Sequence, residues 1–239
     1  RVHLSPVGFE VDRIVLPVIQ LKADKLWLIT HPHDDKGSSF TRKIKDKLKQ
    51  HSIECLEESA NRKDLFDTLR ALRSIIFKEK NNNIMVNVST GSKIQSIATM
   101  MACMMFKDFG NIQPYYVEPE KYTSTSDKQE TKGMKEIISL PDYRIEIPNK
   151  ILIKCLKLID KEKNSSITKK KLKDLAIEQN LIRVNDDKEN KEISAYMALN
   201  TNIVDPLQKW NFITIEKRGK SKIVTLSEDG RNALKFLNP

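Results

Sequence analysis

The sequence contains no hydrophobic run long enough to cross a membrane. Its longest apolar candidate, residues 97–106, is much shorter than the roughly 20 residues that a membrane-spanning helix needs. The chain opens directly in a strand-like pattern, "RVHL", without the regions of a signal peptide. We therefore expect a cytoplasmic protein with no membrane partner.

Cysteine is scarce, because the chain has only Cys55, Cys103 and Cys155, and these lie far apart. None of them belongs to a C-x-x-C pair or to the cysteine–histidine spacing of a zinc site. This distribution favours reduced thiols, buried or half-buried, in a cytosolic protein. It predicts neither a disulfide framework nor a metal centre.

Glycine is scarce too, at seven in 239 residues, and the glycine-rich nucleotide-binding motifs are missing. The chain has neither the G-x-G-x-x-G of dinucleotide sites nor the G-x-x-x-x-G-K-[ST] of P-loops. These absences argue against bound NAD and against ordinary nucleoside triphosphate hydrolysis. We expect no cofactor.

Acidic residues are in deficit, and the deficit is concentrated in one part of the chain. The net charge is +10. Residues 1–148 carry 23 Lys/Arg and 20 Asp/Glu, whereas residues 149–239 carry 19 and 12. The shorter C-terminal part therefore holds +7 of the charge, which indicates a polyanionic partner.

Strand-like and helix-like segments alternate through the first half of the chain. This alternation is typical of a parallel sheet covered by helices on both faces. It predicts an α/β, Rossmann-like, open and mostly parallel sheet, with a polar stretch over 119–148 that supplies an edge hairpin or a connector. The expected strands lie in 1–10, 25–30, 53–59, 83–89 and 112–118, and the expected helices in 12–23, 39–52, 64–80 and 93–106. The last of these helices is apolar nearly all round, so we expect it to be buried.

A domain boundary is expected near Pro148, after which the periodicity becomes helical. Three helices, two strands around a basic turn and a closing helix form the order of a C-terminal winged helix-turn-helix. Pro206 marks a possible bend or break in the third helix. The segments are 149–163, 165–182, 191–213, 212–227 and 227–237. We expect domains at 1–148 and 149–239.

The stretch "NVSTGSK", residues 87–93, is the first candidate site. It follows a predicted strand and opens a predicted helix, and ligands of open α/β sheets bind at such strand ends. Gly91 permits a tight turn, while Ser89, Thr90, Ser92 and Lys93 add hydroxyls and a charge. Backbone amides at the start of a helix attract anions. A plain capped turn is the structural alternative.

Two further loops follow the first two predicted strands. "SPVGFE", residues 5–10, contains Gly8, which allows close approach of a ligand, although a structural turn is an equal alternative. "HPHDD", residues 31–35, contains histidines and acids of metal-ligand type, but nothing completes a cluster. A loop at the rim of the same pocket is the better interpretation of His31.

Basic side chains gather at two places in the C-terminal part. On a helix-turn-helix pattern, lysines at the start of the second helix and at the hairpin tip suit phosphate contacts on both sides of a major groove. Polar residues of the third helix could reach base edges. The phosphate-contacting candidates are Lys169, Lys170, Lys171, Lys173, Lys217, Arg218, Lys220 and Lys222. The base-contacting candidates are Ser194, Tyr196, Asn200, Thr201 and Asn202.

The segments "VHLSPVGFEVDRIVLP" and "VNVSTGSKIQSIA" resemble the two ligand-binding turns of CARF (CRISPR-associated Rossmann fold) domains. A CARF domain followed by a winged helix is similar to archaeal CARF transcriptional regulators, and the resemblance extends over essentially the whole chain. CARF domains sense cyclic oligoadenylates of CRISPR antiviral defence. They are homodimers, with the cyclic ligand lying across the two-fold axis.

The resemblance implies a ligand-responsive transcription regulator that binds double-stranded DNA through the winged helix. It also implies that both subunits contribute the same ligand-binding residues. These are Ser5, Pro6, Val7, Gly8, Phe9 and Glu10 of the first turn, His31 at the rim, and Ser89, Thr90, Gly91, Ser92 and Lys93 of the second turn.

Two other functions stay open. Some CARF domains cleave their own cyclic ligand without a metal, and Ser89, Thr90 and Lys93 would then be the catalytic candidates. No histidine base is visible in that turn. The third possibility is a DNA-binding dimer with no nucleotide effector.

Overall fold

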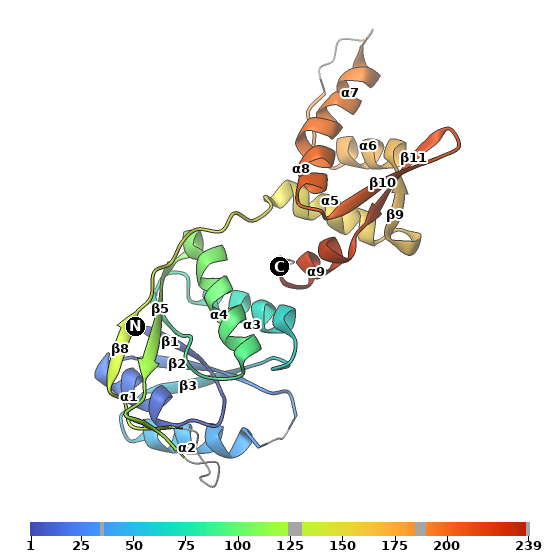
Figure 1. Ribbon diagram of the computed structural model, residues 1–239. Helices are drawn as coiled ribbons and strands as arrows, with labels where there is room; N and C mark the ends of the chain where they lie inside the picture. The colour runs from blue at the N-terminus through green and yellow to red at the C-terminus, as the bar shows by residue number, and fades with distance from the viewer. Residues whose placement is uncertain (34–35, 124–130, 185–189, 238–239) are drawn as a thin grey trace. The chain divides into compact units, whose positions relative to one another are not determined.

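The computed structural model describes residues 1–33, 36–123, 131–184 and 190–237. The chain divides into two compact units, Arg1–Glu146 and Ile147–Pro239 (Figure 1). Each unit has its own hydrophobic cluster, as expected of a separate domain. Within the described ranges, no helix is long and apolar enough to cross a membrane.

A six-stranded sheet forms the centre of the first unit, in the order β3-β2-β1-β4-β5-β8. The first five strands in this order are parallel, and β8 pairs with β5 in the antiparallel sense. The order 3-2-1-4-5 is that of a Rossmann-like sheet, so the predicted fold class is confirmed. The strands are β1 (Val2–Pro6), β2 (Lys25–Thr30), β3 (Glu54–Ser59), β4 (Asn83–Asn87), β5 (Asn111–Glu118) and β8 (Glu136–Ser139).

Helices cover both faces of this sheet. Two of them, α1 and α2, pack together on one face, and α3 and α4 pack together on the other (Figure 1). The polar stretch after β5 supplies a short two-stranded pairing and the antiparallel edge strand β8. The elements are α1 (Asp12–Gln20), α2 (Ser38–Lys49), α3 (Leu65–Lys78), α4 (Lys93–Met105), η1 (Lys107–Phe109), β6 (Lys121–Tyr122) and β7 (Thr131–Lys132).

The apolar core beneath α1 and α2 follows the alternation of strand β2. Leu26 and Leu28 are two residues apart, so they point to the same face of the sheet. There they cluster with Ile14 of α1 and with Ile44 and Leu48 of α2, all fully buried. Each such side chain contributes about 1.5–3 kcal/mol to folding. This packing fixes the position of the loops at the carboxyl ends of β1 and β2.

Helix α4 is not buried all round, contrary to the prediction from its sequence. Its small residues Ala98 and Ala102 are fully buried, but Ile94 is 38% exposed and Ile97 is 54% exposed. The helix packs against α3 and also contacts β4 and β5. Its remaining side presents large apolar residues near the start of the helix.

The second unit has the element order and sheet of a winged helix. Its three-stranded antiparallel sheet has the order β10-β11-β9, and Figure 1 shows the hairpin of β10 and β11 projecting as the wing. The elements are α5 (Lys150–Asp160), η2 (Lys163–Ser165), β9 (Ser166–Thr168), α6 (Lys169–Glu178), α7 (Lys191–Leu199), η3 (Asn200–Val204), α8 (Asp205–Lys209), β10 (Ile213–Arg218), β11 (Ser221–Leu226) and α9 (Glu228–Leu237).

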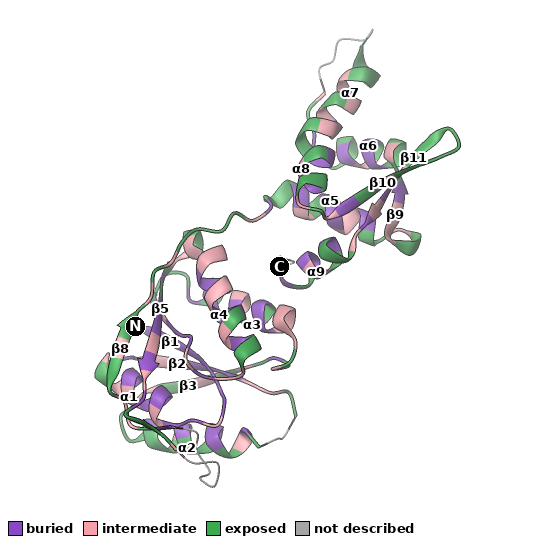
Figure 2. Ribbon diagram, in the orientation of Figure 1, coloured by how far each residue is buried: buried purple, intermediate pink, exposed green. Residues whose placement is uncertain are grey.

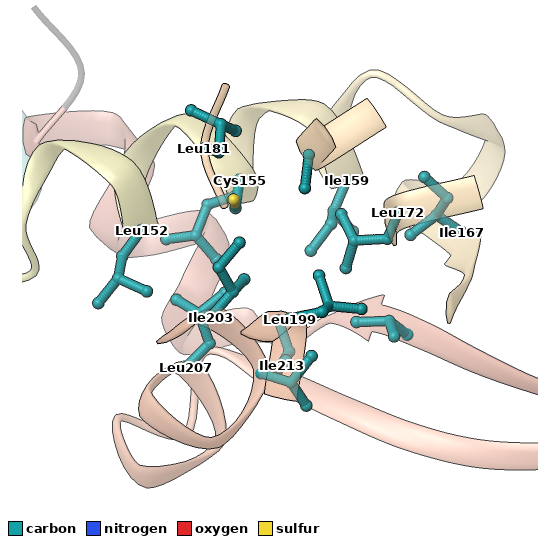
Figure 3. Close-up of a cluster of buried hydrophobic side chains, with 14 of the residues drawn as sticks. Leu152, Cys155, Ile159, Ile167, Leu172, Leu181, Leu199, Ile203, Leu207 and Ile213 are labelled. Atoms are coloured by element: carbon teal, nitrogen blue, oxygen red, sulfur yellow. The ribbon is translucent and has the colours of Figure 1, made fainter. Parts of the chain in front are cut away.

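Side chains from all parts of this unit meet in one apolar core (Figure 3). Cys155 and Ile159 of α5, Leu172 of α6 and Leu199 of α7 are fully buried in it. The i, i+4 spacing of Cys155 and Ile159 gives α5 its inward face. This core fixes the second and third helices relative to the wing.

The third helical segment continues past Pro206 rather than breaking there. Between α7 and α8 the backbone forms a turn of π-helix, η3, and Pro206 follows within the first positions of α8. Proline removes a backbone donor and crowds the preceding turn, and a π-turn accommodates this change. The third helix therefore runs from α7 to α8.

Candidate functional site

The turns after β1 and β4 meet at the carboxyl edge of the sheet, because these strands are parallel neighbours. Gly8 and Gly91 touch backbone to backbone, since a Cβ added at Gly8 would lie 3.0 Å from the Gly91 nitrogen. Gly91 has φ +83°, in the left-handed region that favours glycine. The two turns therefore form one rigid edge.

Side-chain hydrogen bonds hold the two turns in place. The Thr90 hydroxyl donates to the Pro6 carbonyl at 2.8 Å, and Thr90 is buried. The Asn87 amide donates to the Arg13 carbonyl at 2.8 Å, while its oxygen accepts from the backbone N–H and the hydroxyl of Ser89. Thr90 and Ser89 thus use their hydroxyl protons within the turns. Their geometry gives no support to the prediction that these two residues are catalytic.

Ser92 is the N-cap of α4, and it forms a capping box with Gln95. Its hydroxyl accepts from the Gln95 N–H at 3.2 Å, and the Gln95 side chain accepts from the Ser92 N–H at 3.0 Å. The same hydroxyl donates to the Arg62 carbonyl at 2.8 Å. Lys93 is the first residue of the helix, and it is exposed. The positive end of the helix dipole and the Lys93 ammonium therefore lie at the same edge.

Two side chains of the predicted first turn point into the protein. Ser5 is fully buried in β1, and Glu10 is 5% exposed. The Glu10 carboxylate accepts a hydrogen bond from Arg13 Nη1 at 3.0 Å, and Arg13 Nε donates to the Val117 carbonyl at 2.8 Å. Burial and the ion pair thus keep the Ser5 and Glu10 side chains away from the edge, and ligand binding by these two residues stays a prediction.

The remaining residues of the first turn build the edge itself. Pro6, Val7 and Gly8 are buried and have no polar side-chain groups. They therefore form the edge through their backbone. Phe9 is half-buried, and its ring lies 5.7 Å from that of Phe40 on α2.

His31 lies in a cleft of about 330 Å³ at the carboxyl end of β2, which we name the β2–α2 cleft. Val7 of the first turn also lines this cleft, so the His31 loop adjoins the edge described above. The His31 Nδ1 accepts from the His33 N–H at 3.3 Å. The cleft is lined by Val7, Thr30, His31, Pro32, His33, Gly37, Ser38, Thr41, Arg42, Lys45, Glu57 and Arg62.

Three cationic residues of the β2–α2 cleft, Arg42, Lys45 and Arg62, were not predicted from the sequence. Lys45 pairs with Glu57 across the cleft, which leaves the lining with an excess of positive charge. The two candidate metal ligands Asp34 and Asp35 lie outside the described residues. Within the described ranges, no three His, Cys, Asp or Glu side chains come together as a metal site.

The winged helix carries a second hollow, about 540 Å³ in volume, which we name the wing pocket. It lies between the start of α6, the third helix and the wing, and Thr168 caps α6 by accepting from the Lys171 N–H at 3.2 Å. Burial, together with repulsion from Lys222, lowers the pKa of Lys169. The pocket is lined by Thr168, Lys169, Lys170, Tyr196, Asn200, Lys220, Ser221 and Lys222.

The structure brings six of the predicted DNA-binding residues together in the wing pocket. These six are Lys169, Lys170, Tyr196, Asn200, Lys220 and Lys222. The others lie outside its lining: Thr201, Asn202, Lys217 and Arg218 are exposed, Ser194 is half-buried, and Lys171 pairs with Glu162 at 2.7 Å.

Lys173 differs from the other lysines predicted to contact phosphates, because it is buried and paired. It is 7% exposed, and its ammonium lies 3.1 Å from Asp174 and 3.6 Å from Glu192. It also sits over the Tyr196 ring, 4.9 Å from the centroid. Its role is to hold α6 against α7 and to orient Tyr196.

A Rossmann-like domain followed by a winged helix defines the class of this protein. Residues 1–122, just over half of the chain, match the family described as "HFX_2341_N:-like, N-terminal". Residues 151–238 match the "DUF6293 C-terminal winged helix domain". The chain therefore belongs to the HFX_2341-like family. The winged helix predicted from the sequence is confirmed, and the domain order fits the CARF and winged-helix architecture.

A relative in Methanocaldococcus jannaschii, the protein MJ1513, is 29% identical over 220 residues. The match covers 80% of this chain and 66% of MJ1513. The chain thus spans slightly less than two thirds of that relative.

Two solved structures are also similar. One is Can2 from Sulfobacillus thermosulfidooxidans in complex with cyclic tetra-adenylate, with a TM-score of 0.45 and 15% identity over 98% of this chain and 63% of Can2. The other is Enterococcus italicus Csm6 bound to cyclic hexa-2'-fluoro-hexa-dAMP, with a TM-score of 0.43 and 14% identity over 82% of this chain and 59% of Csm6.

Proposed function

We propose that this protein is a ligand-responsive transcriptional regulator. Residues 1–148 would bind a cyclic oligoadenylate as a homodimer, and residues 149–239 would bind double-stranded DNA. The observation that carries the proposal is the rigid edge where Gly8 meets Gly91 at the start of α4, with Lys93 exposed beside it.

The edge has the chemistry of an anion site. Its backbone is fixed by the Thr90 and Asn87 hydrogen bonds, so the turn is already ordered before a phosphate binds. The capping box uses the Ser92 and Gln95 N–H groups, so a phosphate would meet the other amides of the helix start. The Lys93 ammonium adds a full charge. The cations of the adjoining β2–α2 cleft, Arg42 and Arg62, extend the positive surface away from the turn. A ring of adenylates is a polyanion long enough to use both places.

Helix α4 supports a homodimer. Ile94 and Ile97 are exposed, and both are large and apolar. Ile94 directly follows Lys93 and Ile97 lies one turn beyond it, so a second copy packed on these residues would bring the two Lys93 side chains to one composite site. A cyclic ligand has internal symmetry that a two-fold dimer can match.

The wing pocket supports DNA binding. Four lysines from the start of α6 and from the wing, Lys169, Lys170, Lys220 and Lys222, line one hollow. A lysine cluster beside a recognition helix matches a phosphate backbone that borders a major groove. We expect ligand binding to change DNA affinity by a coupling free energy of ~1–3 kcal/mol.

The first test is isothermal titration of the protein with cyclic tetra-adenylate and with cyclic hexa-adenylate. We expect one ring to bind at one per dimer, and Lys93→Ala to weaken it on the order of a hundredfold, since the substitution removes one charge-assisted contact of about 1.5 kcal/mol from each subunit. Lys80→Ala is the matched control, because Lys80 is exposed and follows α3, at the opposite edge of the sheet.

The controls separate the possible outcomes of this titration. No heat with either ring would refute the cyclic oligoadenylate sensor and leave a DNA-binding dimer without that effector. Equal loss in Lys93→Ala and Lys80→Ala would show that the edge is not the site. Recovery of linear product from the titrated sample would establish ring cleavage.

A further inference from the structure

The third helix presents two large apolar side chains outward. Ile193 is 62% exposed and Met197 is 64% exposed, whereas Ala195 and Leu199 on the same helix are buried. Residues 193 and 197 are one turn apart and share a face. This face lies opposite the one that enters the core, and Figure 2 shows exposed positions along α7.

The apolar row runs beside the basic wing pocket. Tyr196 and Asn200, which line that pocket, occupy the neighbouring positions of the same helix. Tyr196 is offset from Met197 by about 100° around the helix axis, and Asn200 lies three residues after Met197. The row therefore lies on the helix face next to the positions that line the basic wing pocket, while the Glu192 side chain on the same helix is exposed.

We infer that Ile193 and Met197 read thymine by contacting its 5-methyl group in the major groove. The inference rests on the proposed DNA-binding function and adds the residues that determine its specificity. The lysines of the neighbouring wing pocket indicate that the partner is a polyanion. Among the bases, only thymine presents an apolar group at the major-groove edge.

The two side chains suit this role in different ways. Ile193 is stiff and has few rotamers, so it offers a fixed apolar surface. Met197 has a flexible thioether chain that adapts to local shape. Exposed Thr201 continues the same row by one turn and can donate to a neighbouring base. The expected preference is therefore for sites with thymine at the positions facing α7.

The test uses the full chain and a random-sequence DNA duplex pool. The wild-type protein first selects bound duplexes, and the selected pool is then amplified once with dTTP and once with dUTP. The two pools have the same sequences, but the second lacks every 5-methyl group. We expect wild type to bind the uracil pool about fourfold more weakly for each thymine contacted, the value of one buried methyl group.

The double variant Ile193→Ala/Met197→Ala should bind both pools with the same affinity. It retains helix propensity, since alanine favours helices, and its thermal melting serves as the folding check. Ile177→Ala on α6, which removes an apolar residue that is 37% exposed, is the control and should keep the wild-type ratio. Any effect of uracil on duplex stiffness is common to all three proteins and cancels in the comparison.

Each outcome decides one point. If the wild-type protein selects DNA but binds both pools equally, the thymine contact is refuted and the DNA-binding function is retained. A wild-type protein that enriches no duplex refutes the DNA-binding function itself. A double variant that sediments with a smaller mass than wild type would assign the row to contact between two copies and would also overturn the inference.

Discussion

Gly91 is the residue on which the geometry of the candidate ligand edge depends most directly. Its φ is +83°, and an added Cβ would lie 2.7 Å from the Pro6 Cβ and 2.9 Å from the Gln95 side-chain oxygen. Gly91→Ala should therefore destabilise the protein by about 1–3 kcal/mol from backbone strain alone. The clash should add to this loss and move the two turns apart.

Gly219→Ala provides a matched comparison for Gly91→Ala. Gly219 also has a positive φ, +59°, but nothing lies within 4 Å of an added Cβ. Chemical denaturation should show a smaller loss for Gly219→Ala, and ligand titration should show weakened binding for Gly91→Ala alone. Equal losses in stability would mean that the contact between the turns is not tight.

His3 is a second residue with a measurable consequence. It is fully buried, and its Nδ1 lies 3.0 Å from the Tyr115 hydroxyl. Burial, followed by the nearby charge of Arg1, lowers the pKa of His3 from 6.5 to about 4. The unfolded chain therefore takes up a proton before the folded chain does. Stability from His3 is full above pH 6.5 and falls as the pH drops toward 4.

The pH dependence can be isolated with His3→Gln, which cannot titrate. The free energy of unfolding of wild type should lose on the order of 3 kcal/mol relative to the variant between pH 6.5 and pH 4. Denaturant titrations at several pH values measure this difference. A wild type and a variant whose curves stay parallel through this range would show that His3 titrates normally in the folded state.

At the scale of elements, periodicity was enough to predict the alternating strands and helices of the first unit. Strands β1 and β2 are buried on both faces, as is typical of the central strands of a parallel sheet. Helix α4 shows where this reasoning ends. A helix that is apolar all round has no polar face to identify its solvent side. The pattern cannot distinguish a helix buried in its own chain from one that keeps an apolar row for a partner.

The sequence predicts less of the site than of the fold, because the residues of the site come from separate loops. The turn at 89–93 has a local signal in the sequence, because a glycine, a helix-capping serine and a lysine follow one another. Arg42 and Arg62 carried none, because each reaches the β2–α2 cleft only through the packing of its own element. Glu10 and Lys173 show another limit of the sequence: charge predicts exposure, but both side chains are buried with charged partners.

On the scale of the whole molecule, the uneven charge predicts how DNA binding should respond to salt. Residues 149–239 hold +7 of the +10 net charge, and Lys169 and Lys222 are close enough for repulsion to help lower the Lys169 pKa. A phosphate between them would relieve this repulsion. If each lysine contacts one phosphate, its removal should reduce the slope of log K against log salt by about 0.9.

The double variant Lys169→Ala/Lys222→Ala should therefore lower that slope by about 2 for each winged helix bound to the duplex, and weaken binding similarly on all sequences. Lys154→Ala, an exposed lysine on α5 outside the wing pocket, should leave the slope unchanged. Titrations of duplex DNA at several salt concentrations measure both. The variant should also be at least as stable as wild type, because it loses a repulsion. An unchanged slope with full stability would place the phosphate contacts away from the wing pocket. A loss of DNA affinity that is confined to particular sequences would assign these lysines to base recognition.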